Sequence, residues 1–242
     1  MSLLVLLYHR ARAGRYGNAP DILEAHFAHI ANTYPNVLPG DSLAARTLNV
    51  CLSFDDGYFD FYATVFPLLK KYHLRALLAI PPNVVREQVE VAAAERLGVE
   101  SDEAFAHPDR GGFCSWVELE EMAGSGHVTM AAHGLTHCRL DAPNAAVEAE
   151  LDAPKNILGA RLAQPIESFV FPFGRYSPDA LQQAKRRYRY VFRIGGALNR
   201  SWDGRLLYRI GADAMKTPWS LFSPGRLATY RARYFWNRLR LR

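Results

Sequence analysis

Two adjacent aspartates, Asp55 and Asp56, are the residues of this 242-residue chain whose type and position point most directly to chemistry. They follow residues 48–54, where apolar side chains at alternate positions predict a buried strand, and Gly57 ends that pattern. An apolar helical period then occupies residues 61–72. Like charges at a strand-to-helix turn repel each other, which favours a bound cation or separate roles. A helix N-cap beside a solvated charge explains the pair alone equally well.

Three histidines also follow predicted strands. His133 and His137 come after residues 128–132, and their spacing brings two imidazoles to one side of a turn. The spacing alone arises by chance, but together with the acidic pair it predicts a metal site. His9 follows the apolar run of residues 3–7. From position alone, His9 is either a hydrogen-bonded structural residue or a catalytic one.

The order of the predicted elements defines the fold class. Apolar and alternating segments predict strands at residues 3–7, 48–54, 74–80, 128–132, 166–171, 188–194 and 206–210. Helical periods between them predict helices at 21–32, 61–72, 91–97, 116–124, 140–162 with a break before Pro154, and 177–187. This alternation predicts an α/β fold with parallel strands, and about seven units favour a barrel, although the pattern does not show closure. Residues 83–112 are expected to form a wall or lid of the site.

Composition and charge limit the class of protein. With 49% hydrophobic and 22% charged residues, the chain is typical of soluble globular proteins. Three irregularly spaced cysteines argue against a disulfide framework and favour a reducing compartment. We interpret the apolar start as the first strand, because it resembles neither a signal peptide nor a membrane span. These observations together predict a cytoplasmic protein.

The positive charge is concentrated in residues 226–242. Six of the 29 basic residues are arginines of this segment, which has no acid, whereas the remaining 23 basic residues are balanced by 24 acidic ones. The segment predicts a helix in which Leu227, Tyr230, Tyr234 and Leu241 form an apolar stripe, while Phe235, Trp236 and Leu239 lie on another sector. Contact with an anionic membrane surface and packing on the barrel with a solvated basic face both remain open. The basic surface is too small to predict nucleic-acid binding.

Three segments in this order resemble motifs of the polysaccharide deacetylase family, the NodB-homology or carbohydrate esterase family 4 enzymes. They are Ser53–Gly57, His133–His137 and Phe171–Gly174, and looser similarity extends over residues 3 to about 213. The resemblance implies a distorted, TIM-like (β/α)7 barrel. We expect this deacetylase domain at residues 1–215, followed by a basic, aromatic and helical segment at 216–242.

The resemblance also implies roles for individual residues. Asp56, His133 and His137 are expected to bind a divalent metal, usually Zn²⁺, with Co²⁺, Ni²⁺ and Fe²⁺ as alternatives. Asp55 is the expected general base, and the backbone N–H of Phe173 is the expected donor to the oxyanion.

The general acid requires a separate argument, because no histidine follows His137. In the permuted subgroup that includes poly-N-acetylglucosamine deacetylases, the acid comes from an N-terminal Tyr-His pair. Tyr8-His9 matches that pair, which makes His9 the expected acid. We further expect four residues to contact the substrate: Tyr8, Trp116, Pro172 and Gly174.

Three residues depart from the family pattern. Gly134 replaces a common Ser or Thr, which removes a supporting hydroxyl. Val170 stands where many members have an arginine that contacts the base, so the partner of Asp55 is in question. Cys138 replaces a frequent proline and is either a small buried thiol or an extra metal ligand. An export signal, which the biofilm enzymes need, is also not recognised.

The expected function is metal-dependent hydrolysis of the N-acetyl amide of an amino sugar. The substrate would be a polysaccharide or its lipid- or nucleotide-linked precursor, used in making surface polysaccharide at the inner face of the membrane. An O-acetyl esterase or N-deformylase acting on a glycan is not distinguished by the sequence. A non-catalytic carbohydrate-binding member of the fold is a further alternative.

Overall fold

Seven parallel strands form a closed barrel in the computed structural model, which describes residues 1–203 and 206–240. Consecutive strands are neighbours, and β1 pairs with β7 through Leu6 with Ile210 and Leu7 with Gly211. The strands are β1 (Ser2–Tyr8), β2 (Leu48–Phe54), β3 (Ala76–Ile80), β4 (Val128–Ala132), β5 (Ser168–Val170), β6 (Tyr190–Ile194) and β7 (Leu207–Gly211). The predicted (β/α)7 barrel is confirmed, and the β1–β7 pairing supplies the closure that the sequence pattern did not show.

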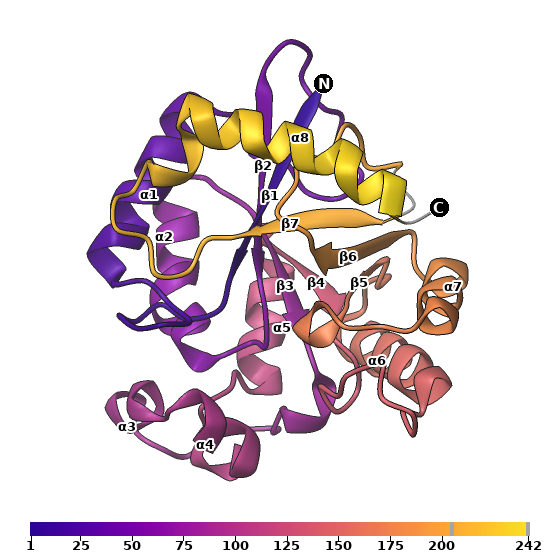
Figure 1. Ribbon diagram of the computed structural model, residues 1–242. Helices are drawn as coiled ribbons and strands as arrows, with labels where there is room; N and C mark the ends of the chain where they lie inside the picture. Colours follow the sequence, from indigo (N-terminus) through magenta and orange to yellow (C-terminus); the bar gives the residue numbers. More distant parts are fainter. Residues whose placement is uncertain (204–205, 241–242) are drawn as a thin grey trace.

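Helices surround this barrel, as Figure 1 shows. They are α1 (Pro20–Thr33), α2 (Phe66–Lys71), α3 (Ala93–Gly98), α4 (Ser101–Ala106), α5 (Trp116–Gly124), α6 (Val147–Leu162), α7 (Pro178–Arg187) and α8 (Pro224–Arg240). A π-helical turn at Phe61–Val65 leads into α2. Short 3₁₀ turns lie at Pro82–Val84, Pro108–Arg110, Pro172–Gly174 and Ser220–Phe222.

Alternation along the strands divides the core into two layers. Leu3, Val5, Cys51 and Leu77 belong to one buried cluster inside the barrel. The intervening strand residues join the helix residues in a second cluster, outside the barrel wall. Because both faces of each strand are buried, the strands have the continuous apolar sequence typical of parallel sheets. The same alternation directs two polar strand residues, Ser53 and Arg209, toward the interior, since Cys51 and Leu207 point there.

Helix α6 differs from the prediction that it would be interrupted. It runs without a break from Val147 to Leu162, with Pro154 inside it. Pro154 is buried on the same helix face as Leu151 and Leu158. Packing of this face against the barrel outweighs the loss of one backbone hydrogen bond at the proline, which is why the expected break before Pro154 is wrong.

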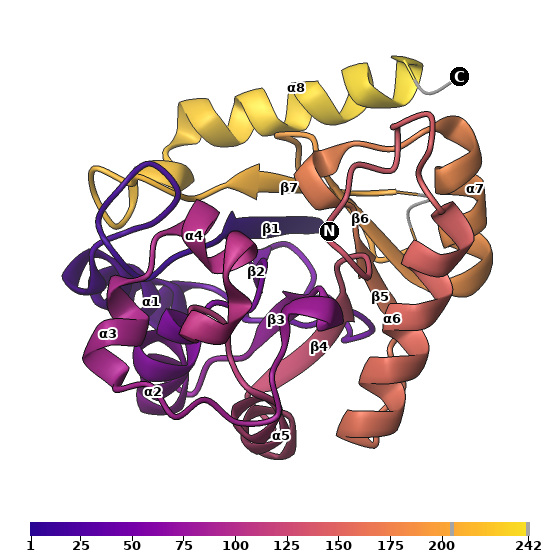
Figure 2. The same cartoon turned by 90° about the horizontal axis from the view of Figure 1, so that it is seen from below.

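The two segments of uncertain role both lie against the barrel. Residues 83–112 contain α3 and α4 and contribute Ser101, Asp102 and Phe105 to a cavity wall, as the sequence predicted. Helix α8 covers the barrel beside β7 in both views (Figures 1 and 2), and its Tyr230 is buried. The expectations for Leu241 and Arg242 lie outside the described residues.

Candidate active site

A cavity of about 630 Å³ opens at the carboxyl ends of the strands. Its lining brings together most of the predicted site: His9, Asp55, Asp56, His133, His137, Phe173 and Gly174. Loops after four strands, β1, β2, β4 and β5, supply these residues, since parallel strands present their carboxyl ends at one edge. The barrel therefore brings four segments that are distant in the sequence together in one site.

The turn after β2 orients the two aspartates. Asp56 and Gly57 both have left-handed backbone, with φ of 73° and 71°. The left-handed backbone favours glycine at position 57, and a Cβ there would also lie 2.5 Å from the Cδ1 of Ile80, which would have to move. The left-handed conformation of Asp56 costs roughly 1 kcal/mol, and it persists because it turns the adjacent carboxylates to different neighbours.

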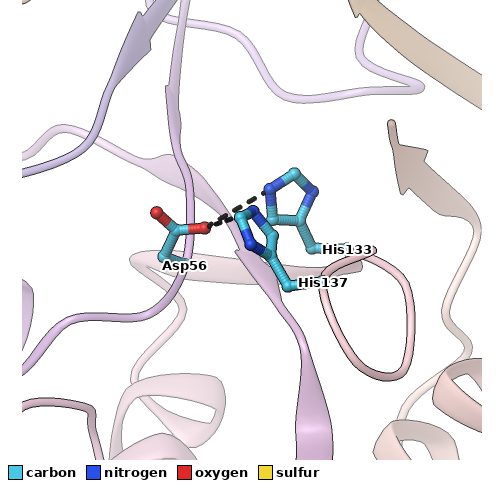
Figure 3. A group of neighbouring side chains, drawn as sticks. All are labelled: Asp56, His133 and His137. Carbon is cyan, nitrogen blue, oxygen red and sulfur yellow. Dashed lines mark ion pairs between the residues drawn. The ribbon is translucent and has the colours of Figure 1, made fainter. Parts of the chain in front are cut away.

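Asp56 points at two imidazoles, as Figure 3 shows. Its Oδ1 lies 3.1 Å from Nε2 of His137 and 3.4 Å from Nε2 of His133. The other ring nitrogen of His133, Nδ1, lies 2.8 Å from the carbonyl oxygen of Val170, which accepts a hydrogen bond from Nδ1–H and leaves Nε2 available to bind a metal. The three ligand atoms lie within 4.8 Å of one another.

This cluster fits a divalent metal. Oδ1 of Asp56 is buried, and within the described structure it forms no well-aligned hydrogen bond; its polar neighbours are the two imidazole nitrogens, an arrangement that suits a cation held between the three atoms. Burial would raise the pKa of Asp56, but His133 and His137 outweigh it and hold the pKa well below its usual range. One carboxylate and two imidazoles leave positions for water and substrate, as in catalytic zinc sites.

Glu150, on α6, supports the loop that carries the two histidines. Its Oε2 accepts hydrogen bonds from the backbone N–H groups of Leu135 (2.8 Å) and Thr136 (3.1 Å), and its Oε1 accepts one from the Thr136 hydroxyl (2.6 Å). A Cβ on Gly134 would lie 2.7 Å from Glu150 Oε2. Gly134, which departs from the family pattern, therefore makes room for a carboxylate that supports the loop instead of a hydroxyl.

Asp55 has a different partner, Arg209 of β7. Two nitrogens of Arg209 donate to the two carboxylate oxygens of Asp55 at 2.6 and 2.8 Å, and Nη1 also donates to the Ser53 hydroxyl at 3.0 Å. Burial would raise the pKa of Asp55, but the charges of Arg209 and His133 lower it. Asp55 is therefore an ionised carboxylate in a fixed orientation. Arg209 supplies the partner that the sequence left in question at Val170, whose side chain is buried inside the barrel.

His9 is paired with Asp213, which follows β7. Its Nδ1 lies 2.6 Å from Asp213 Oδ2, and its backbone N–H donates to Oδ1 at 3.1 Å. Burial alone would lower the pKa of His9, but the hydrogen bond with Asp213 and the charges of Asp55, Asp213 and Asp56 raise it to about 9. His9 therefore holds its proton at neutral pH, as a general acid must.

Aromatic side chains form one wall around His137. The Phe105 ring stacks on it at 4.6 Å, and the Phe173 ring lies at the same distance on a tilted plane. Phe173 has left-handed backbone with φ of 56°, and its side chain is 57% exposed. Its role as oxyanion donor stays a prediction. Cys138 is half-buried, and burial raises its thiol pKa, so it is a neutral thiol outside the metal cluster.

Three of the four residues expected to contact the substrate lie outside the cavity lining. Tyr8 is fully buried outside the barrel wall, where its hydroxyl lies 2.7 Å from His26 Nε2 and its ring stacks on Phe54. Trp116 is buried on α5 beneath Arg161, and Pro172 is also buried. None of the three lines the cavity, whereas Gly174 does.

Several functional residues were missed, but two had a signal in the sequence. Arg209 interrupts an apolar strand, and Glu150 lies on the i, i+4 row of Pro154 and Leu158, the buried face of its helix. A charged residue on a buried face requires a partner, which is the signal that could have revealed both. Asp213 has no comparable signal.

The family follows from a direct comparison. Residues 45–191, more than half of the chain, match the family described as polysaccharide deacetylase. The chain belongs to the polysaccharide deacetylase family. The acidic pair and His133–His137 both lie inside the matched region, whereas His9, Arg209 and Asp213 lie outside it.

Individual relatives are distant. "Putative polysaccharide deacetylase YxkH" of Bacillus subtilis (strain 168) is 22% identical over 194 residues, or 76% of this chain and 61% of that protein. The chain thus spans about three fifths of that relative's length. The Streptococcus pyogenes deacetylase PplD, solved with acetate, has a TM-score of 0.72 at 20% identity, covering 95% of this chain and 98% of its own. A de-N-acetylase from Aggregatibacter actinomycetemcomitans has a TM-score of 0.68 at 20% identity, covering 87% and 94%. At these identities the structures establish the shared barrel fold.

Removing the charge of Glu150 should loosen the histidine loop. We expect Glu150→Gln to weaken zinc binding about tenfold, because groups that orient metal ligands typically contribute this much to affinity. Chelator competition measures the affinity, with the exposed Glu148→Gln on the same helix as the matched control. Unchanged zinc affinity in Glu150→Gln would show that the loop holds its shape without the carboxylate.

Replacing Arg209 by lysine keeps the charge but removes the two-point contact with Asp55. We expect Arg209→Lys to lower kcat of acetyl hydrolysis by at least about tenfold while the zinc content stays the same, because only the base loses its orientation. Arg75→Lys, at the partly exposed pair with Asp41, is the control. Wild-type kcat in Arg209→Lys would refute the positioning role.

Removing the charge of Asp213 should change the pH dependence. His9 is protonated below its pKa of about 9, so activity that needs this acid is present below that pH and lost above it. In Asp213→Asn the pKa moves toward or below the ordinary value of 6.5. We therefore expect the alkaline limb of kcat/KM for zinc-loaded protein to move to lower pH by roughly one unit or more. An unmoved limb would exclude His9 as the titrating acid.

Proposed function

We propose that this protein is a metal-dependent hydrolase that removes the N-acetyl group from an amino sugar of a polysaccharide or its precursor. One observation supports this most strongly: Asp55 and His9 border the same cavity, next to the metal-ligand cluster, with pKa values shifted in opposite directions. Environments that separate two titratable groups in this way identify a base and an acid. Membership of the polysaccharide deacetylase family supports an acetyl group as the acyl group that is removed.

A divalent cation held by Asp56, His133 and His137, most suitably Zn²⁺, would polarise the acetyl carbonyl and acidify a water molecule when bound. Asp55, fixed by Arg209, takes one proton from the attacking water, whose oxygen then bonds to the carbonyl carbon. The N–H of Phe173 is the proposed donor to the resulting oxyanion.

His9 completes the reaction on the leaving-group side. It gives its proton to the amide nitrogen as the C–N bond breaks, so that the products are acetate and a free amine. Asp55 then returns its proton to solvent, and His9 regains one. An amide nitrogen needs a proton in order to depart, and a protonated His9 at the cavity can supply it.

The nature of the glycan is a further part of the proposal. The cavity is lined by mixed polar and aromatic groups, including Asn83, Asp102 and Tyr16, which suit a sugar with hydroxyl groups and apolar ring faces. The two solved relatives named above are a deacetylase bound to acetate and a de-N-acetylase, which supports the same bond type. The substrate that we propose is a polysaccharide or its lipid- or nucleotide-linked precursor.

Acetate release and zinc content test this function together. We expect zinc-loaded protein to release acetate from N-acetylglucosamine oligomers or lipid-linked sugars. Asp55→Asn and His9→Ala should keep the zinc but lose activity by about 10²- to 10⁴-fold, because each removes one proton transfer. Asp179→Asn and His107→Ala, both exposed, are the matched controls.

Bound zinc without acetate release from any of these substrates would contradict the proposal. Release of formate from N-formyl sugars would identify an N-deformylase. Release of acetate only from O-acetylated glycans would identify an O-acetyl esterase. Glycan binding without hydrolysis would identify a carbohydrate-binding protein.

A further inference from the structure

Helix α8 uses one of its faces to hold the barrel. Tyr230 is 5% exposed, and its carbonyl oxygen accepts a hydrogen bond from the Leu198 N–H at 3.1 Å. The Tyr234 ring lies 6.4 Å from Tyr208 of β7, edge to face. Asn237 donates to the carbonyl oxygen of Gly195 at 2.9 Å. The described residues of the predicted stripe, Leu227, Tyr230 and Tyr234, therefore attach the helix to the barrel, and packing of α8 on the barrel is confirmed.

The opposite face of α8 is apolar and exposed. Phe235, Trp236 and Leu239 are 61%, 56% and 62% exposed. Ala228 and Ala232 are exposed on the same side, since positions 228, 232, 235 and 239 follow the helical period. We call these five residues the outer face of α8. A helix packed on a soluble barrel normally presents polar side chains there, so exposed aromatic and aliphatic groups mark an interaction surface.

Positive charge borders this face, and the helix itself carries no acidic residue. Arg226, Arg231 and Arg233 are exposed on its flanks, and residues 224–240 contain no acid. A second copy docking face to face would bring these arginines together without carboxylates to compensate them, which is unfavourable. An anionic lipid surface instead offers an apolar boundary for the aromatic side chains and phosphates for the guanidinium groups.

We propose that the outer face of α8 docks on the surface of an anionic lipid bilayer. The helix lies in the interface plane and does not cross it: among the described helices, none is long and apolar enough to span a membrane. Figure 2 shows α8 at the outer edge of the molecule, and the residues of its outer face are exposed.

Docking through α8 would fix the cavity relative to the lipid. Gly195, which α8 contacts through Asn237, directly follows Ile194 of the cavity lining. At the helix start, Arg226 borders a surface depression together with Asp213, the partner of His9. Such placement suits a glycan attached to a membrane lipid. This consequence rests on the proposed function. The docking of α8 on lipid does not rest on it.

Vesicle binding by the full chain tests the docking. We expect cosedimentation with phosphatidylcholine–phosphatidylglycerol vesicles, weakening with salt, and much weaker binding to phosphatidylcholine alone. The triple variant F235S/W236S/L239S should bind at least about tenfold more weakly, because apolar burial is lost. Charge reversal at Arg226, Arg231 and Arg233 should weaken binding to the anionic vesicles by at least about fivefold per residue.

Two controls distinguish docking from non-specific hydrophobic binding and from misfolding. V117S/I157S removes two exposed apolar side chains from α5 and α6 and should bind as wild type. All variants should keep the wild-type melting temperature, since the altered side chains are exposed. Equal vesicle binding by wild type and the triple variant would overturn the proposal. Self-association of the wild type that the triple variant abolishes would overturn it in favour of a second copy. Neither result depends on deacetylase activity.

Discussion

The two-point contact between Arg209 and Asp55 is the interaction on which the site depends. Two neighbouring carboxylates are buried at the end of β2, and each needs its own compensating charge. Arg209 compensates Asp55 from inside the barrel, while His133 and His137 face Asp56. Because the arginine occupies both oxygens of Asp55, this residue is held as an ionised carboxylate, and we propose Asp55 as the base and Asp56 as the metal ligand.

Other residues of the barrel orient the histidines of the site. The Val170 carbonyl sets which nitrogen of His133 faces Asp56, and Glu150 holds the loop that carries His137. Asp213 holds His9 and keeps it protonated. Each support comes from a different strand or helix than the residue it orients, so the geometry of the site is a property of the closed barrel.

The sequence predicted the parts of this account that depend on local pattern. The strands, the acidic pair and the two histidines are read from periodicity and spacing, and these residues meet as expected. Arg209 and Asp213 could not be assigned, because their partners lie more than 150 positions away and meet them only when β7 pairs with β1. Tyr8 was misassigned because the alternation of β1 turns it outward, whereas His9 lies beyond the strand. The sequence shows two apolar sectors on α8, and only the structure shows which of them packs on the barrel.

The most direct test of the division between Asp55 and Asp56 is anomalous diffraction at the zinc edge from zinc-soaked crystals. We expect one strong peak among Asp56 Oδ1, His133 Nε2 and His137 Nε2, with Asp55 still bound to Arg209 through both oxygens. A peak coordinated by Asp55, with Arg209 displaced, or no peak at this cluster, would contradict this division.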